Sequence, residues 1–179
     1  MARAVRVWDP VVRIAHWSVA GLVAVNLMNE AGANPVHRGI GYAIGALVLA
    51  RLGWGLAGLR YARLAEIARR AALSPAYVLS RAARAEARAY PGLNPLGAAM
   101  ALLLWALLAA AVATGGMLQL DEWWGDEDLQ RAHATSSWAL AVCAAVHVIG
   151  VLATSAARRV NLVKAMITGS KTLPGERAP

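Results

Sequence analysis

Residues 131–155 read RAHATSSWALAVCAAVHVIGVLATS and hold two of the four histidines of the chain. His147 follows His133 by 14 residues. In an α-helix, 14 steps of 100° return to within about 40° of the starting direction, so both imidazoles lie on one face. They are about 21 Å apart along the helix axis, compared with about 30 Å for the hydrocarbon core of a bilayer. This apolar stretch therefore predicts a membrane-spanning helix with one histidine in each leaflet.

The composition is that of a membrane protein. Hydrophobic residues make up 59% of the 179 residues and charged residues 16%, which is far from the norm for soluble domains. The apolar residues form four blocks, at about 11–29, 37–58, 96–120 and 131–155. We therefore expect an all-α integral membrane protein, with one domain over 1–179 and four transmembrane helices in an up-down-up-down bundle. The net charge is +8, but the arginines flank the apolar blocks, so membrane topology explains them and no nucleic-acid partner is expected.

The segments between the blocks differ in charge. Residues 59–95 form a basic connector with seven arginines and two glutamates, and 61–73 are expected to form an interfacial helix within it. Residues 121–128 hold five acids and two tryptophans, as at a membrane interface. The basic tail, 156–179, is expected to be partly disordered beyond Thr168. The N-terminal segment, connector and tail hold 15 of the 18 Lys and Arg residues, so the positive-inside rule predicts that both termini are cytoplasmic.

Depth in this topology pairs the histidines. His16 enters the first helix from the inside, and His147 lies toward the inside of the fourth. His37 begins the second helix from the outside, and His133 begins the fourth. Crossed pairs would be about 20 Å apart, too far to share one metal ion. The sequence therefore predicts an inner pair, His16 with His147, and an outer pair, His37 with His133.

Two histidines at one depth suit the two axial positions of a haem iron. Non-haem zinc or copper is the main chemical alternative, but structural zinc usually takes four ligands, often including cysteine or carboxylate. A histidine in a membrane helix can also serve only to hydrogen-bond a neighbouring helix. Because the matched depths use every histidine, we expect haem ligation. Gly41 and Gly45 permit the close approach of a helix or a flat ligand.

Four arginines are candidates for binding the carboxylates of such a haem, because guanidinium groups bind carboxylates bidentately. Arg51 is an intramembrane cation, 14 residues after His37 and on the same face. Arg38 and Arg131 flank the outer pair, and they alternatively mark helix ends at the lipid headgroups. Arg13 lies toward the inner pair, as does the basic connector.

A set of motifs is spread over nearly the whole chain. They are Val7-Trp8-Asp9-Pro10, Arg13, His16-Trp17, His37, Gly41-Tyr42, Arg51, Trp54-Gly55, Tyr61-Ala62-Arg63, Asn94-Pro95 and NLVKAMITG at 161–169. In combination they resemble the bacterial cytochrome b-561 family, which includes the cytochrome b subunits of nickel-iron hydrogenases. The resemblance implies a four-helix di-haem b protein that exchanges electrons with quinone, with the four histidines as axial ligands. The chain departs from the family's pattern at Leu93, often a histidine, and at Ala134, often an acid.

We therefore expect a multi-pass di-haem b cytochrome of the bacterial inner membrane, with two haem b cofactors and quinone as substrate. It would transfer electrons between the quinone pool and a periplasmic cytochrome c or other redox protein. One alternative is a superoxide:quinone oxidoreductase, although the acidic turn would repel an anionic substrate and better suits a basic cytochrome c. Further alternatives are a haem-bearing membrane anchor subunit of a larger redox complex, such as a hydrogenase, and a haem sensor or carrier. Whether the chain is itself an enzyme depends on which of these holds.

Overall fold

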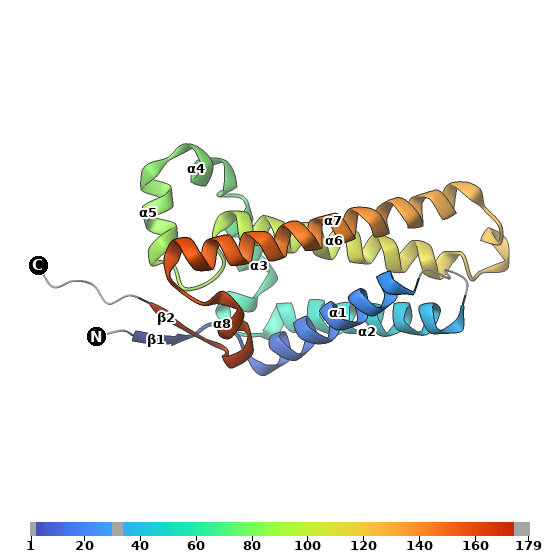
Figure 1. Cartoon of the computed structure of the whole chain (residues 1–179), viewed down its shortest axis with the longest axis horizontal. Coiled ribbons are helices and arrows are strands. Elements are labelled where there is room, and N and C mark those ends of the chain that lie inside the picture. The colour runs from blue at the N-terminus through green and yellow to red at the C-terminus, as the bar shows by residue number, and fades with distance from the viewer. Residues whose placement is uncertain (1–2, 30–33, 174–179) are drawn as a thin grey trace, which may run out of the picture.

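The computed structural model describes residues 3–29 and 34–173. Four long helices form an elongated bundle, and shorter elements gather at one end of it (Figure 1). The long helices are α1 (Pro10–Met28), α2 (Pro35–Ala57), α6 (Pro95–Met117) and α7 (Glu127–Arg158). All four are long and apolar enough to cross a membrane, so the predicted four-helix membrane bundle is confirmed.

Helices α1, α2 and α6 begin in the same way, on an Asp-Pro or Asn-Pro step. Proline suits the first helical position because its φ is already helical and it has no N–H to leave unpaired. The side chains of Asp9 and Asn94 each accept the backbone N–H three residues on, at 2.9 and 2.7 Å. Asn34 does the same for the backbone N–H of His37, at 2.8 Å. This cap fixes the first turn of α2, which carries one of the paired histidines.

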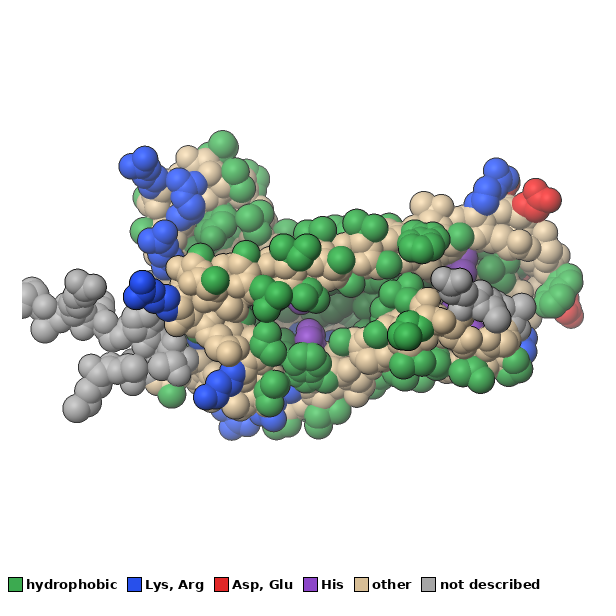
Figure 2. Space-filling view, in the orientation of Figure 1, with side chains coloured by type: hydrophobic (Ala, Val, Ile, Leu, Met, Phe, Trp, Pro, Cys, Tyr) green, Lys and Arg blue, Asp and Glu red, His purple; other side chains and the backbone are tan. Residues whose placement is uncertain are grey.

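Each long helix packs beside the next long helix of the chain. Thus α1 packs on α2, α2 on α6, and α6 on α7. Ile44, Val48, Leu108 and Leu140 form a buried cluster between α2, α6 and α7. Many other apolar side chains of the bundle are exposed, as expected of a surface that faces lipid. Helices α1 and α7 pack on each other much less. A long hollow runs between them, and histidine side chains are visible inside it (Figure 2).

The described ends of the chain meet at one end of the bundle, which we call the terminal end. The opposite end, where α1 is followed by α2 and α6 by α7, is the loop end. Strands β1 (Arg3–Arg6) and β2 (Ser170–Leu173) pair antiparallel at the terminal end, and α8 (Leu162–Thr168) precedes β2. The sequence did not predict this small sheet, which gives order to residues 170–173 within the stretch expected to be partly disordered. Residues 174–179, the rest of that stretch, lie outside the described residues.

The basic connector contains four short helical elements. They are η1 (Arg60–Ala62), α3 (Leu64–Ala71), α4 (Ser74–Leu79) and α5 (Arg81–Ala89). The helix expected over 61–73 is shorter in the structure, where α3 begins at Leu64, because Arg63 has an extended backbone, with ψ of 137°. The Arg63 Nε donates to the Gly58 carbonyl at 3.0 Å, a contact that holds the chain in this bend.

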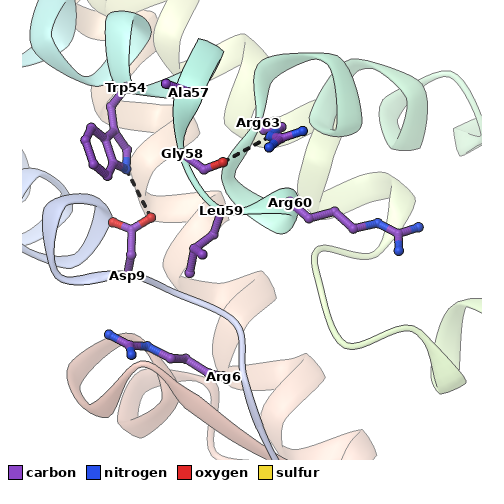
Figure 3. Close-up of a pocket in the computed structure, with 8 residues that line it drawn as sticks. All are labelled: Arg6, Asp9, Trp54, Ala57, Gly58, Leu59, Arg60 and Arg63. Atoms are coloured by element: carbon purple, nitrogen blue, oxygen red, sulfur yellow. Dashed lines mark hydrogen bonds between the residues drawn. The ribbon is translucent and has the colours of Figure 1, made fainter.

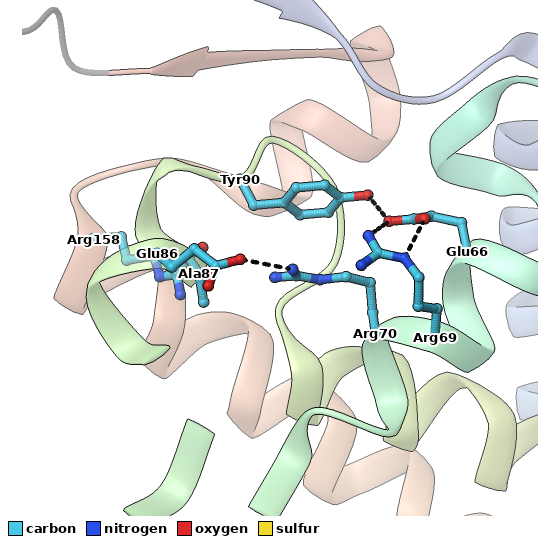
Figure 4. A network of polar contacts seen from close by, with 7 residues as sticks. All are labelled: Glu66, Arg69, Arg70, Glu86, Ala87, Tyr90 and Arg158. Carbon is cyan, nitrogen blue, oxygen red and sulfur yellow. Dashed lines mark hydrogen bonds and ion pairs between the residues drawn. The ribbon is translucent and has the colours of Figure 1, made fainter. Parts of the chain in front are cut away.

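A polar network links α3 to the end of the connector (Figure 4). The Glu66 carboxylate accepts from the Arg69 Nε at 3.0 Å and from the Tyr90 hydroxyl at 2.5 Å. These bonds, that of Arg69 above all, hold the pKa of Glu66 below its ordinary value. Burial is the main cause that raises the pKa of the Tyr90 hydroxyl, and its hydrogen bond to the Glu66 carboxylate raises that pKa further. Arg70 is 3% exposed and lies over the Tyr90 ring, with its Cζ 4.0 Å from the ring centre.

Helix α7 differs most from its predicted bounds, because it extends beyond the apolar block 131–155 at both ends. The Asp126 carboxylate caps its start by accepting the Leu129 N–H at 2.7 Å. Arg159 ends it in the left-handed conformation, with φ of 52°. The N-terminal extension, 127–130, is mostly polar and the C-terminal one ends at Arg158, so hydropathy alone does not set these bounds. Helix α6 ends at Met117, and η2 (Asp121–Trp123) follows in the acidic turn.

Candidate functional site

The inner pair joins the first and last long helices. His16 of α1 and His147 of α7 have ring centres 6.4 Å apart, with ring planes at 56°. The Nδ1 of His16 is buried and has no hydrogen-bond partner among the described residues. The structure therefore brings together the two histidines that the depth argument places in the same leaflet.

The outer pair joins α2 to α7 near the loop end. His37 and His133 have ring centres 6.2 Å apart, with ring planes at 81°. The Nδ1 of His133 lies 3.0 Å from the Ala111 carbonyl oxygen and 3.1 Å from the Thr114 Oγ1, both on α6. The sequence did not predict that these two oxygens of α6 would lie beside the His133 ring.

Both ring separations fit two imidazoles on opposite sides of one metal ion. An imidazole nitrogen binds a first-row ion such as zinc at about 2.0–2.1 Å. Two such bonds in line, with about 1.1 Å from each ring centre to its nitrogen, place the ring centres about 6.3 Å apart. Among the described residues, no group of three or more His, Cys, Asp or Glu side chains could hold a metal ion. Each pair therefore fits the axial positions of a haem iron better than a zinc site with four protein ligands.

A groove surrounds the outer pair, lined by all four long helices. Gly41 and Gly116 line it, and a Cβ on either would meet nothing within 4 Å. Their backbones are therefore open to a flat group. Part of the buried cluster of α2, α6 and α7 forms the apolar wall. The Arg38 Nη1 donates to the Gln119 Oε1 at 2.8 Å, and both residues line the groove.

Of the four candidate arginines, Arg51 is the one with a buried donor that lacks a partner in the described part of the chain. It is 8% exposed, and its Nη2 donates to the Ala62 carbonyl at 2.9 Å. Its Cζ lies 4.9 Å from the Trp105 ring centre. The Nη1 is buried without a hydrogen-bond partner in the described part of the chain. An unmet buried donor costs about 1–3 kcal/mol, and more when charged, so this nitrogen is available to an anionic group.

The other candidate arginines differ in their surroundings. Arg38 lines the groove of the outer pair. The Arg13 Nη1 donates to the Thr168 carbonyl at 3.2 Å, which links α1 to α8. Arg131 is 73% exposed and pairs with Asp128 of its own helix at 2.5 Å. Arg131 does not line the groove. Its anionic partner, Asp128, belongs to the acidic turn.

A cavity of about 440 Å³ at the terminal end was not predicted. Figure 3 shows it between the start of α1, the end of α2 and the connector. The Trp54 Nε1 donates to the Asp9 Oδ2 at 3.1 Å across this space. Arg6, Arg60 and Arg63 contribute basic side chains to the lining. Asp9 and Trp54 both lie in the motifs quoted above, but their contact is tertiary and spacing along the chain does not predict it.

The geometry agrees with what comparison with known proteins shows. A family model described as prokaryotic cytochrome b561 matches residues 7–169. The chain belongs to the prokaryotic cytochrome b561 family. It is therefore a multi-pass prokaryotic membrane protein and a b-type cytochrome that binds haem b and takes part in electron transfer. No curated protein and no solved structure matches the chain.

Proposed function

We propose that this b561-family cytochrome binds two haem b groups and carries electrons across the membrane between quinone and a partner at the loop end. The observation that supports this most is the arrangement of the four histidines as two pairs, with ring centres 6.4 and 6.2 Å apart. When bound, each haem iron supplies one-electron chemistry by alternating between its ferric and ferrous states.

The chain's own residues hold and shield these groups. Imidazoles from α1, α2 and α7 would hold the haem irons, and the apolar wall of the groove would keep water from the outer site. The free Nη1 of Arg51 is our candidate partner for a haem carboxylate near the inner pair. Arg38 is the candidate near the outer pair. Arg13 and Arg131 have other partners, so we assign neither of them to a haem carboxylate.

We place the terminal end in the cytoplasm of a bacterial inner membrane. Most basic side chains gather at that end (Figure 2), and the positive-inside rule then sets the orientation. The cavity beside Trp54 is our candidate site for the quinone ring. It combines an indole that is 38% exposed and Leu59, which is 43% exposed, with guanidinium donors for the quinone carbonyls.

The loop end then faces the periplasm and carries the acidic turn, 121–128. We propose a basic redox protein, such as a cytochrome c, as the partner there, because opposite charges steer association. The same acids disfavour superoxide as substrate. A hydrogenase-type anchor subunit would differ in one measurable respect, because it would not react with quinone without the rest of its complex.

The haem count tests the cofactor proposal. Pyridine haemochrome quantitation of the purified protein should give two b haems per chain, and both should be low-spin in the oxidised and reduced spectra. One haem per chain, or high-spin iron at both sites, would contradict two bis-histidine sites.

The quinone site needs its own experiment. Trp54→Ala should slow reaction of the reduced protein with a water-soluble quinone by about tenfold, because the variant loses a wall of the cavity and the Asp9 contact. Trp138→Ala is the matched control, since Trp138 is 70% exposed on α7 and does not line the cavity. Equal rates for the two variants would remove the cavity as the quinone site.

A further inference from the structure

His133 is tied to a neighbouring helix through one ring nitrogen. Its Nδ1 lies 3.0 Å from the Ala111 carbonyl oxygen. A carbonyl oxygen only accepts, so this nitrogen carries the proton and Nε2 keeps the lone pair that a metal ion needs. The Thr114 hydroxyl donates to the Ala110 carbonyl at 2.7 Å. Its oxygen, 3.1 Å from the His133 Nδ1, is therefore a second acceptor for the His133 N–H.

The next residue of α6 leaves room for the His133 ring. A Cβ on Gly115 would lie 2.9 Å from the His133 Cε1 and 3.2 Å from its Nδ1. A side chain at this position would force the His133 ring or its neighbours to shift. Thr114 and Gly115 together therefore form a seat, which we call the His133 seat, that selects one tautomer and one ring orientation.

The inner pair has no equivalent arrangement around His16. The Nδ1 of His16 is buried without a hydrogen-bond partner in the described part of the chain. Its closest aromatic neighbour in sequence, Trp17, meets it edge-on with ring centres 5.2 Å apart, and an indole ring offers no strong acceptor. The Nδ1 of His37, the other member of the outer pair, is likewise buried without a partner among the described residues. The difference between the two pairs therefore lies at His133.

We propose that the His133 seat gives the outer site a lower reduction potential than the inner site, with Thr114 as a positioning residue. This inference rests on the proposed haem ligation by the four histidines. A ligating imidazole that donates its other N–H to an oxygen becomes a more basic ligand. A more basic axial ligand stabilises the ferric state and lowers the potential. Arg51, with its free buried positive charge, acts in the opposite direction on the inner site.

This ordering gives electron transfer a direction. One electron that enters at the loop end moves downhill from the outer to the inner site, which oxidises the outer site and reduces the inner one. Two such electrons, together with two protons from solvent at the terminal end, reduce one quinone to quinol. The loop-end partner is then the electron donor, and quinone is the acceptor.

The test is a spectroelectrochemical titration of holoprotein variants. Thr114→Val should retain two haems and raise the outer midpoint. The reduced-to-oxidised ratio of the outer site at a fixed potential should rise three- to tenfold, about 28–59 mV at 59 mV per tenfold change. Thr114→Ser keeps the acceptor oxygen and should restore the wild-type midpoint. Thr135→Val makes the same chemical change on an exposed position of α7 and should shift neither midpoint.

Two further variants assign the signals and separate the possible failures. His147→Ala should hold the outer haem alone and so identifies its midpoint. If His133→Ala still binds two haems, the ligation proposal fails. If Thr114→Val binds two haems with unchanged midpoints, ligation stands and the seat has no tuning role. If Thr114→Val loses the outer haem, recovery of that haem in Thr114→Ser supports the seat, and loss in both variants overturns it.

Discussion

The two ends of the bundle hold the same kind of histidine pair in different surroundings. At the loop end, His37 is placed by a capped first turn, and His133 by its seat on a helix that packs directly against its own. At the terminal end, His16 and His147 belong to helices that pack on each other only weakly. Under the proposed ligation both sites would use two imidazoles, so differences between them would come from the hydrogen-bond partners of those imidazoles and from nearby charge.

The inner pair depends on the terminal end for its spacing. Helix α1 is linked to α8 through Arg13 and Thr168, and the Val7 and Trp8 N–H groups donate to the Gly169 carbonyl at 2.8 and 3.1 Å. Helix α8 follows α7 in the chain, so these contacts hold α1 near α7 across the hollow. The outer pair needs no such assembly. We therefore expect the inner site to be the more sensitive of the two to changes at the chain ends.

The largest expected effect is the loss of one site. His147→Ala should remove the inner haem and halve the haem content, because one imidazole and a buried methyl group cannot supply two axial ligands. The outer absorption band should remain. The measurement is haem quantitation with a reduced-minus-oxidised spectrum on folded, monodisperse protein. Loss of both haems from such protein would show that the two sites depend on each other.

The next effect concerns charge beside the inner site. Arg51→Leu removes a buried cation, so the inner midpoint should fall by about 59 mV, a tenfold change in the redox ratio. The outer midpoint should not move. Arg81→Gln is the control, because it removes a charge at the terminal end from an exposed position of α5. A titration in which the Arg51 and Arg81 variants coincide would leave Arg51 with a structural role only.

Sequence patterns predicted what hydropathy and helical periodicity can detect. The four long helices and the two histidine pairs follow from apolar blocks and from depth, because both depend on a fixed rise per residue. Bounds set by polar caps were less accurate, as at Asp126 and Arg159, where α7 continues beyond the apolar block. The strand at 170–173 was missed because its partner, β1, is at the other end of the chain.

The hydrogen-bond partners of the paired histidines could not be predicted for a similar reason. The contact between His133 and Thr114 depends on how α7 is rotated against α6, which spacing along one helix does not determine. A weak signal was present, since Thr114, two glycines and Gln119 interrupt the apolar end of the third block. The Asp9–Trp54 contact likewise spans 45 residues. Histidines that share one helix face can be identified from the sequence, whereas contacts between helices require the structure.

A smaller effect is expected at the surface of the loop end. Asp126→Lys with Asp128→Lys should slow electron transfer with a basic cytochrome c several-fold at low ionic strength, mainly through the association rate. The difference should shrink as salt rises, because exposed charges are screened within about 10 Å at 0.1 M. Stopped-flow haem oxidation or reduction by the cytochrome, over a salt series, measures it. Reaction with quinone should be unchanged, and a flat salt dependence would leave the acidic turn as a solvated loop.

The smallest effect concerns the stability of the terminal end. The Lys171 Nζ donates to the Pro91 carbonyl at 2.7 Å and the Gly92 carbonyl at 3.3 Å. Burial, with a contribution from Arg158, lowers the pKa of Lys171 from 10.5 to about 8. Between pH 8 and 10.5 the unfolded chain therefore binds this proton more than the folded chain does, so stability rises with pH in that window. The slope from this one group is at most about 1.4 kcal/mol per pH unit.

Lys171→Met removes the titrating group, so wild type should gain thermal stability relative to this variant as pH rises from 8 to 10. Lys164→Met, at an exposed position of α8, should follow the wild-type pH dependence. The measurement is the unfolding midpoint in detergent at each pH, with haem absorbance recorded in the same scans. Because the inner pair is held by this end, its band should disappear before the outer band in wild type. Parallel pH curves for all three proteins would show that Lys171 is hydrated in solution, and simultaneous loss of both bands would show that the two ends unfold as one unit.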